Sequence, residues 1–372
     1  DICSLKEKVD RLVFSCFMEI DKKGNIHKYD VCKSVINSKK RFTYEEVQNI
    51  LDKQEGKFLH KINEMNELHK ILFKRRLDEG SLDFESTEVK AEIENGLIKS
   101  IKPKERLDSM RMIEDFMLVA NKCVTLFVER QKRKVPFIYR IHDIPDKKRI
   151  AELSQFVKQF GLRVDPENKR SIQKMLMEVE GRPEEYLIND ITIRAMSKAI
   201  YSEENIGHYG LGFDHYTHFT SPIRRYPDLI VHRILFDILN GMNAKKTAHY
   251  SKVLPDISKQ STDREINAVQ AEREAIKILQ CQYMENQVGM ILNGIVSGIS
   301  EYGIYVEITE SMIEGMVRLR DMNDDYYILD QQNYQIVGRN RRKKYRIGDK
   351  VKVKVHKVDT EHRWIDLAFV KQ

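Results

Sequence analysis

The N-terminal part of the chain alternates between strand-like and helix-like hydrophobic patterns. Residues 9–20 (VDRLVFSCFMEI) combine alternation with a continuous apolar stretch, which is typical of a strand. Residues 21–24 supply a turn and residues 26–36 return as a second strand, so a β-hairpin is predicted. Thr43 and Glu46 then have the spacing of a capping box, which predicts a helix start.

Helical periodicity dominates the middle of the chain. Apolar residues recur at helical spacing over 58–76, and a strand and turn are predicted over 81–96. A long helix with an apolar stripe is predicted from Pro103 to about Arg130, followed by a strand over 135–143. Further helices are predicted over 147–160 (ending at Gly161), 169–180, 184–199, from Pro227 onward, and over 255–285.

Short alternating runs replace the helical pattern after Gln287. They cover residues 288–299, 302–308, 314–319, 350–358 and 363–370. Five short strands separated by glycine-containing turns are typical of a small β-barrel of the OB-fold type. We therefore expect a domain boundary at Gln287, with residues 1–286 and 287–372 as separate units.

Composition narrows the class of protein. The 372 residues are 41% hydrophobic and 33% charged with both signs interspersed, as in packed domains with a solvated surface. The formal net charge of +7 favours a polyanionic partner. No apolar run approaches the roughly 20 residues of a membrane span, and no signal peptide is visible, so we expect no membrane association.

The cysteines indicate a reducing compartment. They are scattered, odd in number and without C-x-x-C spacing: Cys3, Cys16, Cys32, Cys123 and Cys281. This argues against both a disulfide framework and a zinc site, so a cytoplasmic location is expected. The first residue is Asp1 rather than methionine, in what reads as mid-domain, so we expect a part of a longer protein.

A proline-bracketed bend is the first candidate for chemistry. Pro222 and Pro227 flank Arg224 and Arg225, and each proline disfavours the α conformation of the residue before it. Ser221 and Tyr226 are therefore expected to be extended or turned, with the arginines on a stiff bend. Rigid guanidinium groups near a helix start suit phosphate binding. On spacing alone, the pair fits equally well a structural role, tying the helix start to a neighbouring acidic loop.

The predicted barrel is the second candidate. Tyr302 and Tyr305, beside Gly303, lie on one predicted strand, with Arg318 available to join them. A basic loop over 339–344 follows. Aromatic residues beside a basic groove stack on and track single-stranded nucleic acid. A lone tyrosine would be uninformative, but the barrel, the aromatics and the loop together favour RNA binding.

The stretch GHYGLGFDHYTHFTSPIRRYPDLIVHRIL from Gly207 resembles the signature of the RNase II/RNase R (RNB) exoribonuclease family, most closely its bacterial RNase R members. Other family landmarks follow the family's order: CSLKEKVDRL at Cys3, RFTYEEV at Arg41, FES at Phe84, YRIHD at Tyr139 and AER at Ala271. YGIYV and IEGMV are similar to the family's S1 domain. The resemblance implies a partial α+β RNB-type catalytic domain, its helices packed around a sheet, followed by an all-β OB-fold (S1) barrel.

The resemblance also implies a function. It is processive 3′→5′ hydrolysis of single-stranded RNA to 5′-mononucleotides with Mg²⁺ as cofactor, and we expect a monomer. Arg224 matches the family arginine that neutralises charge on the scissile phosphate, and Glu272 matches an acidic residue near the metal site. Tyr44 matches an aromatic that packs against bases near the 3′ end. We assign further RNA contacts to His142, Arg225, Tyr302, Tyr305 and Arg318.

The chain departs from the family pattern at the metal site. The family's aspartate cluster lies upstream of the position equivalent to Cys3 and is not in this sequence. Asp321, Asp324 and Asp325 lie in the barrel domain, where an acidic run is more often a solvated loop or turn. We therefore assign no metal ligand here and expect the Mg²⁺ ligands upstream. The alternative function is a non-catalytic RNA-binding module.

Overall fold

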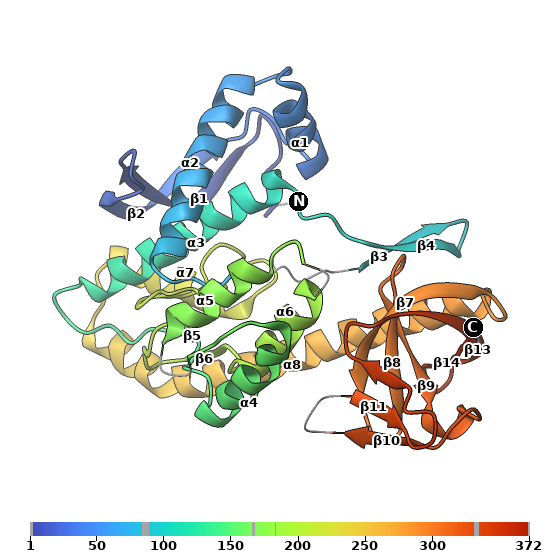
Figure 1. The fold of residues 1–372 in the computed structure, drawn as a ribbon. Coiled ribbons are helices and arrows are strands. Elements are labelled where there is room, and N and C mark those ends of the chain that lie inside the picture. The colour runs from blue at the N-terminus through green and yellow to red at the C-terminus, as the bar shows by residue number, and fades with distance from the viewer. Residues whose placement is uncertain (1–2, 84–88, 166–167, 183, 331–334, 371–372) are drawn as a thin grey trace.

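The computed structural model describes residues 3–83, 89–165, 168–182, 184–330 and 335–370. These ranges form a mainly helical N-terminal part and a C-terminal β-barrel (Figure 1). One long helix runs along the first part and into the second. The predicted combination of an α+β region and an all-β barrel is confirmed.

The predicted N-terminal hairpin is also confirmed. β1 (Asp10–Ile20) pairs antiparallel with β2 (Ile26–Asn37). Asp21 closes the turn between them, because its Oδ1 accepts the backbone N–H groups of Lys23 and Asn25, both at 2.8 Å. Val31 on β2 is buried and anchors one face of the hairpin to the core.

The helix after the hairpin begins with the predicted capping box. α1 (Tyr44–Lys53) has Thr43 as its N-cap. The Glu46 N–H donates to Thr43 Oγ1 at 3.2 Å, and the Thr43 N–H donates to the Glu46 carboxylate at 2.7 Å. α2 (Leu59–Asp78) follows and packs against α1 and α3.

The prediction of a helix starting at Pro103 is wrong. β3 (Val89–Glu94) and β4 (Leu97–Pro103) form a hairpin, and Pro103 is its last paired residue, opposite Val89. A proline is tolerated at the end of an edge strand, and α3 (Asp108–Glu129) begins only after a short link. The FES landmark at residues 84–86 lies outside the described residues.

A group of short helices shares one apolar core. It contains α4 (Lys147–Val157), the 3-10 helix η1 (Lys158–Phe160), α5 (Lys169–Val179) and α6 (Glu185–Ala195). Gly161, with φ of 74°, ends the first helix as predicted. β5 (Tyr139–Ile141) and β6 (Ile200–Ser202) form a short antiparallel pair, so the strand predicted over 135–143 is only three residues long.

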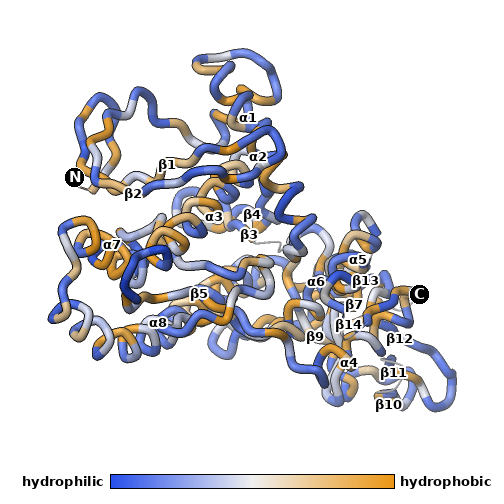
Figure 2. The backbone as a smooth tube through the Cα atoms, turned by 90° about the vertical axis from the view of Figure 1, so that its left-hand side faces the viewer, coloured by the Kyte–Doolittle hydropathy of each residue, from blue (hydrophilic) through white to orange (hydrophobic). Residues whose placement is uncertain are grey.

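α7 (Tyr226–Leu239) lies in the core together with α3 and α8, and its tube is largely hydrophobic in Figure 2. Pro227 occupies the first turn as predicted, but Tyr226 is the first helical residue rather than an extended one. α8 (Ala244–Glu285) starts well before the predicted Pro255, which lies inside it. Leu254, next to that proline, is fully buried, so packing holds the helix through the proline.

The predicted five-stranded barrel is confirmed. Its strands close in the order β13-β14-β9-β8-β7. They are β7 (Ile291–Ile299), β8 (Gly303–Ile308), β9 (Ile313–Arg318), β13 (Lys350–Asp359) and β14 (Trp364–Phe369). Gly303 permits close strand approach, since a Cβ there would lie 2.6 Å from the Val317 carbonyl oxygen.

The segment between the third and fourth barrel strands is more regular than predicted, and residues 339–343 of the basic loop connect two of its strands. After the 3-10 helix η2 (Leu319–Asp321), β10 (Tyr327–Asp330), β11 (Gln335–Gly338) and β12 (Lys344–Arg346) form a three-stranded sheet. Apart from this sheet and the barrel, the described strands form only the pairs β1–β2, β3–β4 and β5–β6. The helices predicted to pack around a sheet pack, in the described residues, against two-stranded pairs: α3 lies against β1 and β2, and α8 against β6. No helix within the described ranges is long and apolar enough to span a membrane.

Candidate functional site

A tight turn presents Arg224 and Arg225 at the start of α7. The Ser221 carbonyl accepts the backbone N–H groups of Arg224 at 3.3 Å and Arg225 at 3.0 Å. The Ser221 N–H donates to Asp228 Oδ1 at 2.7 Å, and Pro227 stands in the first helical turn. The bend is therefore hydrogen-bonded to the helix that it introduces.

The two arginines have different environments. The Arg225 guanidinium donates to Asp228 Oδ1 at 2.8 Å, and the Asp228 side chain is fully buried. Arg225 thus has the structural role that its spacing left open, and its predicted contact with RNA stays a prediction. Arg224 is exposed, and its side chain has no hydrogen bond or ion pair with the described residues. Arg224 is therefore the cation that the turn offers to a ligand.

The segment leading into the turn is anchored by buried hydrogen bonds. Thr217 Oγ1 donates to the Ile138 carbonyl at 2.7 Å, and the Phe219 N–H donates to Asn121 Oδ1 at 2.9 Å. Asn121 Nδ2 also donates to the Tyr216 hydroxyl at 3.1 Å. Asn121 belongs to α3 and Ile138 precedes β5, so two elements distant in sequence fix the path of the chain into the turn.

Arg140 connects this region to α8. Its guanidinium donates twice to Glu265, at 2.6 and 3.2 Å, and lies over the Tyr201 ring at 4.7 Å. The Tyr201 hydroxyl is 2.8 Å from His218 Nδ1. Burial, together with the positive charges of Arg225 and Arg140, lowers the pKa of His218 to about 2. His218 is therefore neutral near pH 7, and the positive charge of the region resides on the arginines.

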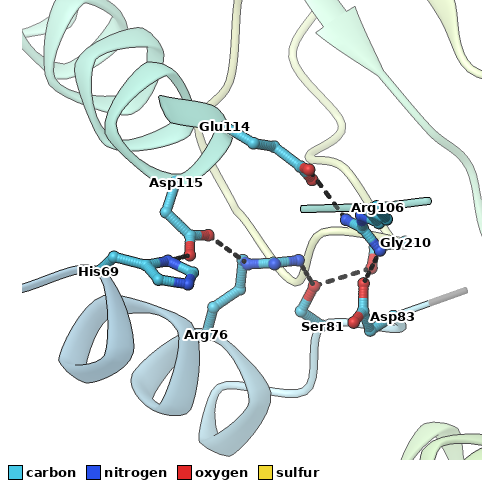
Figure 3. A network of polar contacts seen from close by, with 8 residues as sticks. All are labelled: His69, Arg76, Ser81, Asp83, Arg106, Glu114, Asp115 and Gly210. Atoms are coloured by element: carbon cyan, nitrogen blue, oxygen red, sulfur yellow. Dashed lines mark hydrogen bonds and ion pairs between the residues drawn. The ribbon is translucent and has the colours of Figure 1, made fainter. Parts of the chain in front are cut away.

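A buried polar network holds the glycine-containing loop that precedes this segment (Figure 3). Asp115 Oδ2 is 2.7 Å from His69 Nδ1, and Arg76 Nε donates to Asp115 Oδ1 at 3.2 Å. Arg76 also donates to Ser81 Oγ at 3.1 Å, and Ser81 Oγ donates to the Gly210 carbonyl at 3.5 Å. All four side chains are buried. α2 and α3 therefore fix the position of Gly210.

His142 secures the same glycine from the other side. The Gly210 N–H donates to His142 Nδ1 at 2.9 Å, so His142 Nε2 carries the proton and donates to the Ser197 carbonyl at 2.7 Å. A Cβ at Gly210 would lie 2.8 Å from His142 Nδ1, so the contact requires glycine. His142 is buried with both ring nitrogens engaged. Its position makes it a support for the loop, and the predicted contact with RNA stays a prediction.

A concave surface on the barrel brings together the aromatic residues predicted from its sequence. Tyr302, Tyr305 and Arg318 all line it, together with Trp364. Tyr302 is 77% exposed and Trp364 56% exposed. Exposed aromatic rings on a concave face suit the stacking of planar groups.

Arg318 supports this surface as an ion pair. It donates to both carboxylate oxygens of Asp366, at 2.9 and 2.8 Å, and lies 5.6 Å from the centroid of the Trp364 ring. Because Asp366 neutralises its charge, Arg318 orients Trp364 more than it attracts phosphate. Positive charge on the surface also comes from Lys277 of α8 and from Arg320.

Comparisons with known proteins match both parts of the chain. The model described as "RNB domain" matches residues 1–241. The chain belongs to the RNB family. The model described as "S1 RNA binding domain" matches residues 285–369, which include the barrel.

The RNB chain is similar to bacterial proteins named Ribonuclease R. That of Aquifex aeolicus is 37% identical over 383 residues, covering 100% of this chain and 54% of the relative. That of Thermotoga maritima is 38% identical over 384 residues, with the same coverages of 100% and 54%. The chain therefore spans about half the length of these relatives.

Solved structures agree with this assignment. The apo form of Mycoplasma genitalium RNase R has a TM-score of 0.93 and 26% identity, covering 99% of this chain and 59% of that one. The same protein in complex with ribose methylated single-stranded RNA gives the same TM-score of 0.93. The RNB and S1 folds assigned to the sequence are thus found together in one solved protein.

Two other residues predicted from the RNB resemblance lie on different elements from the arginine turn. Tyr44 is the first residue of α1 and 44% exposed, and it lines a cavity of about 590 Å³ together with Phe58 and Met65. Glu272 is exposed on α8 and has no hydrogen bond or ion pair with the described residues. Glu265, on the same helix, is the acidic residue that contacts Arg140.

Several supporting residues were missed by the sequence analysis. Asp115 and Asn121 are polar residues on the buried, mainly apolar face of α3, and that irregularity was their available signal. Trp364 is the only tryptophan in the sequence and begins a predicted barrel strand. Glu265 left no local signal, because its partner Arg140 is 125 positions away.

The described residues do not fit a Mg²⁺ site. Within the described ranges, no three His, Cys, Asp or Glu side chains are grouped as a metal site requires. Asp325 instead closes a turn, accepting the backbone N–H groups of Tyr326 at 2.7 Å, Asn340 at 3.0 Å and Arg341 at 2.6 Å. We therefore assign no metal-dependent step to these residues.

Proposed function

We propose that this chain supplies the phosphate-binding turn and the RNA-tracking surface of a 3′→5′ exoribonuclease. The enzyme acts processively on single-stranded RNA and releases 5′-mononucleotides. The observation that carries the proposal is the exposed Arg224 on a turn closed by Asp228, beside an Arg225 that is already paired. Membership of the RNB family and the relatives named Ribonuclease R support it.

Arg224 acts on the scissile phosphate. Its guanidinium donates N–H groups to the phosphate oxygens, where negative charge develops during hydrolysis. The turn is hydrogen-bonded through Ser221 before any substrate binds, so little reorganisation is required on binding. The neighbouring His218 is neutral and hydrogen-bonded to Tyr201, so it leaves Arg224 as the phosphate ligand.

The barrel surface holds the RNA strand away from the reacting phosphate. Tyr302 and Trp364 stack on bases, with a contribution of about 1–3 kcal/mol per base. Stacking tolerates any base, which suits an enzyme that moves along its substrate. The Mycoplasma genitalium relative bound to single-stranded RNA supports RNA as the ligand.

Cofactor, assembly and location complete the proposal. We propose Mg²⁺, with ligands outside the described residues, and a monomer in the cytoplasm. The five free thiols support a reducing compartment. We keep residues 1–286 and 287–372 as the two units, since α8 ends at Glu285 and β7 begins at Ile291. Sedimentation equilibrium measures the state of assembly.

The test compares Arg224→Ala with Arg182→Ala, a second exposed arginine, in the protein with its complete natural sequence. For Arg224→Ala we expect kcat to fall by about 10²–10³-fold while the RNA dissociation constant changes by less than about threefold. Arg182→Ala should retain both values. Equal losses in kcat and affinity for Arg224→Ala would contradict a role aimed at the transition state.

A non-catalytic RNA-binding module is the second candidate. It is supported by the match of residues 285–369 to the S1 RNA binding domain. On that hypothesis the complete protein binds RNA with an affinity that falls with salt but shows no turnover with Mg²⁺. Mg²⁺-dependent release of mononucleotides excludes this candidate.

A further inference from the structure

The β3–β4 hairpin leaves the helical part of the molecule and reaches the barrel (Figure 1). Ile101 on β4 is 3% exposed and belongs to the apolar core of the barrel. In that core it joins barrel residues such as Val296 and the α8 residues Cys281 and Met284. Val89, Ala91 and Ile98 of the hairpin pack against the same core.

Only one face of the hairpin packs against this core. The opposite face carries charged side chains, including the surface pair Lys102 and Glu92. Ile93 near the hairpin's tip is 57% exposed although it lies on the apolar face with its partner Ile98. An isolated two-stranded hairpin is at best marginally stable in water. The hairpin therefore depends for its order on the core that α8 and the barrel form together, and its apolar face packs against that core.

The barrel has further ties to the rest of the chain. α8 runs into it, and Lys277 of α8 donates to the Glu314 carbonyl at 3.0 Å. Ile347, between β12 and β13, packs against the core of α4, α5 and α6. The hairpin adds an attachment from a third segment, which lies between α2 and α3 in sequence.

We propose that the β3–β4 hairpin is an intramolecular strap, with Ile101 as its anchor, that positions the Tyr302–Trp364 surface relative to the Arg224 turn. Both α2 and α3, which flank the hairpin, carry the network that holds Gly210 near that turn. The strap therefore ties the barrel to the helices that support the phosphate-binding segment. The effect of the strap on RNA binding rests on the proposed function, whereas the packing of the hairpin against the barrel core does not.

The docking is tested by hydrogen exchange in the complete chain. Ile101→Asp places a charge in the apolar core of the barrel, and Ile93→Asp makes the same change at an exposed position near the tip of the same hairpin. We expect the β3–β4 amides to exchange at least about tenfold faster in Ile101→Asp and at the wild-type rate in Ile93→Asp. Ile101→Ala removes the packing without adding a charge and should show the same acceleration if Ile101→Asp fails to fold. Ile101→Val should restore slow exchange.

Unchanged exchange in Ile101→Asp and Ile101→Ala, or equal acceleration in Ile93→Asp, overturns the anchor. Faster exchange throughout the barrel and α2 as well as the hairpin indicates general destabilisation and also overturns it. A hairpin that is released while the barrel strands stay protected supports it.

The positioning is tested with RNA of two lengths. One oligonucleotide has about 20 nucleotides, and the other about 4, too short to engage both surfaces. In Ile101→Ala we expect affinity for the long RNA to fall about tenfold while affinity for the short RNA is retained, because only the long RNA gains from simultaneous contact. Equal loss for both lengths, or loss for neither, contradicts positioning by the strap. If the wild-type protein binds neither RNA, the proposed function is wrong, and the exchange experiment alone decides the docking.

Discussion

Arg140 and Glu265 form an ion pair with hydrogen bonds of 2.6 and 3.2 Å across 125 positions of sequence. The pair joins β5 to α8 beside the segment that carries the arginine turn. Arg140 is only 13% exposed and Glu265 34% exposed, so neither charge is fully solvated. The long helix that enters the barrel is thus attached to the candidate active site by a specific polar contact.

Removal of Glu265 should destabilise the fold. In Glu265→Ala the largely buried Arg140 loses its acceptor, and we expect the free energy of unfolding to fall by about 1–3 kcal/mol. Glu272→Ala is the matched control on the same helix and should change it by less than about 0.5 kcal/mol. Urea denaturation measures both, and equal losses would show that the ion pair has no special role. The activity of Glu272→Ala separately tests the role predicted for Glu272.

Asp115→Asn should have a larger effect. The substitution removes the negative charge from a buried group that includes Arg76 and His69, and we expect a loss of about 2–4 kcal/mol. The neighbouring Glu114, which pairs with Arg106 in a more exposed position, provides the control Glu114→Gln, with a loss below about 1 kcal/mol. Urea denaturation measures the unfolding free energy of both variants. An Asp115→Asn variant as stable as the wild type would show that the buried charge is not essential.

His218 should make the protein sensitive to mild acid. Its folded pKa of about 2 lies below the unfolded value of 6.5, so the unfolded chain binds the additional proton between these values. The stability contributed by the neutral His218 is complete above pH 6.5 and is lost as the pH falls below it, by about 2 kcal/mol at pH 5.

His218→Gln should therefore weaken the dependence of unfolding free energy on pH between 7 and 5. Burial also lowers the pKa of His232, so His232 should preserve part of the pH dependence of the unfolding free energy in His218→Gln. His249→Gln, at an exposed histidine, should keep the wild-type slope. Denaturant titrations at several pH values give the three slopes, and identical slopes for wild type and His218→Gln would refute the assignment.

Trp364 gives a direct optical test of the barrel surface. As the only tryptophan, it should change its fluorescence when single-stranded RNA binds. Trp364→Ala should weaken RNA binding about tenfold through loss of one stacking contact. Tyr326→Ala, at an exposed tyrosine outside this surface, should bind like wild type in fluorescence anisotropy. Unchanged binding by Trp364→Ala would remove this surface from the proposed RNA path.

Local sequence rules predicted the elements whose determinants are local. The Thr43–Glu46 capping box and the Gly161 helix stop depend on neighbouring residues and were both confirmed. The pattern predicts a helix from about Pro255, but α8 begins at Ala244 and continues through this proline, which lacks a backbone donor. Burial of Leu254 in a core formed with α3 and α7 outweighs the missing hydrogen bond, and such packing is not visible in a local window.

The candidate site was predictable only in part for the same reason. The motif around Arg224 carried its own signal, but the distinction between Arg224 and Arg225 depends on the direction of each side chain relative to Asp228. The prediction of His142 as an RNA contact came from the sequence, which gives no measure of how far its ring is buried. The structure engages both of its ring nitrogens within the fold.

Because α8 is continuous, a change in its length would alter both the distance and the rotation of the barrel relative to Glu265. Between Glu265, held by Arg140, and Lys277, beside the barrel, the chain stays helical. Each residue inserted there would shift the barrel by about 1.5 Å and turn it by about 100° around the helix axis. A single insertion would point the aromatic surface in a new direction, whereas seven residues, close to two full turns, would nearly restore it. Insertions in this part of α8 are therefore expected to preserve the direction of the aromatic surface only when they add nearly complete helical turns.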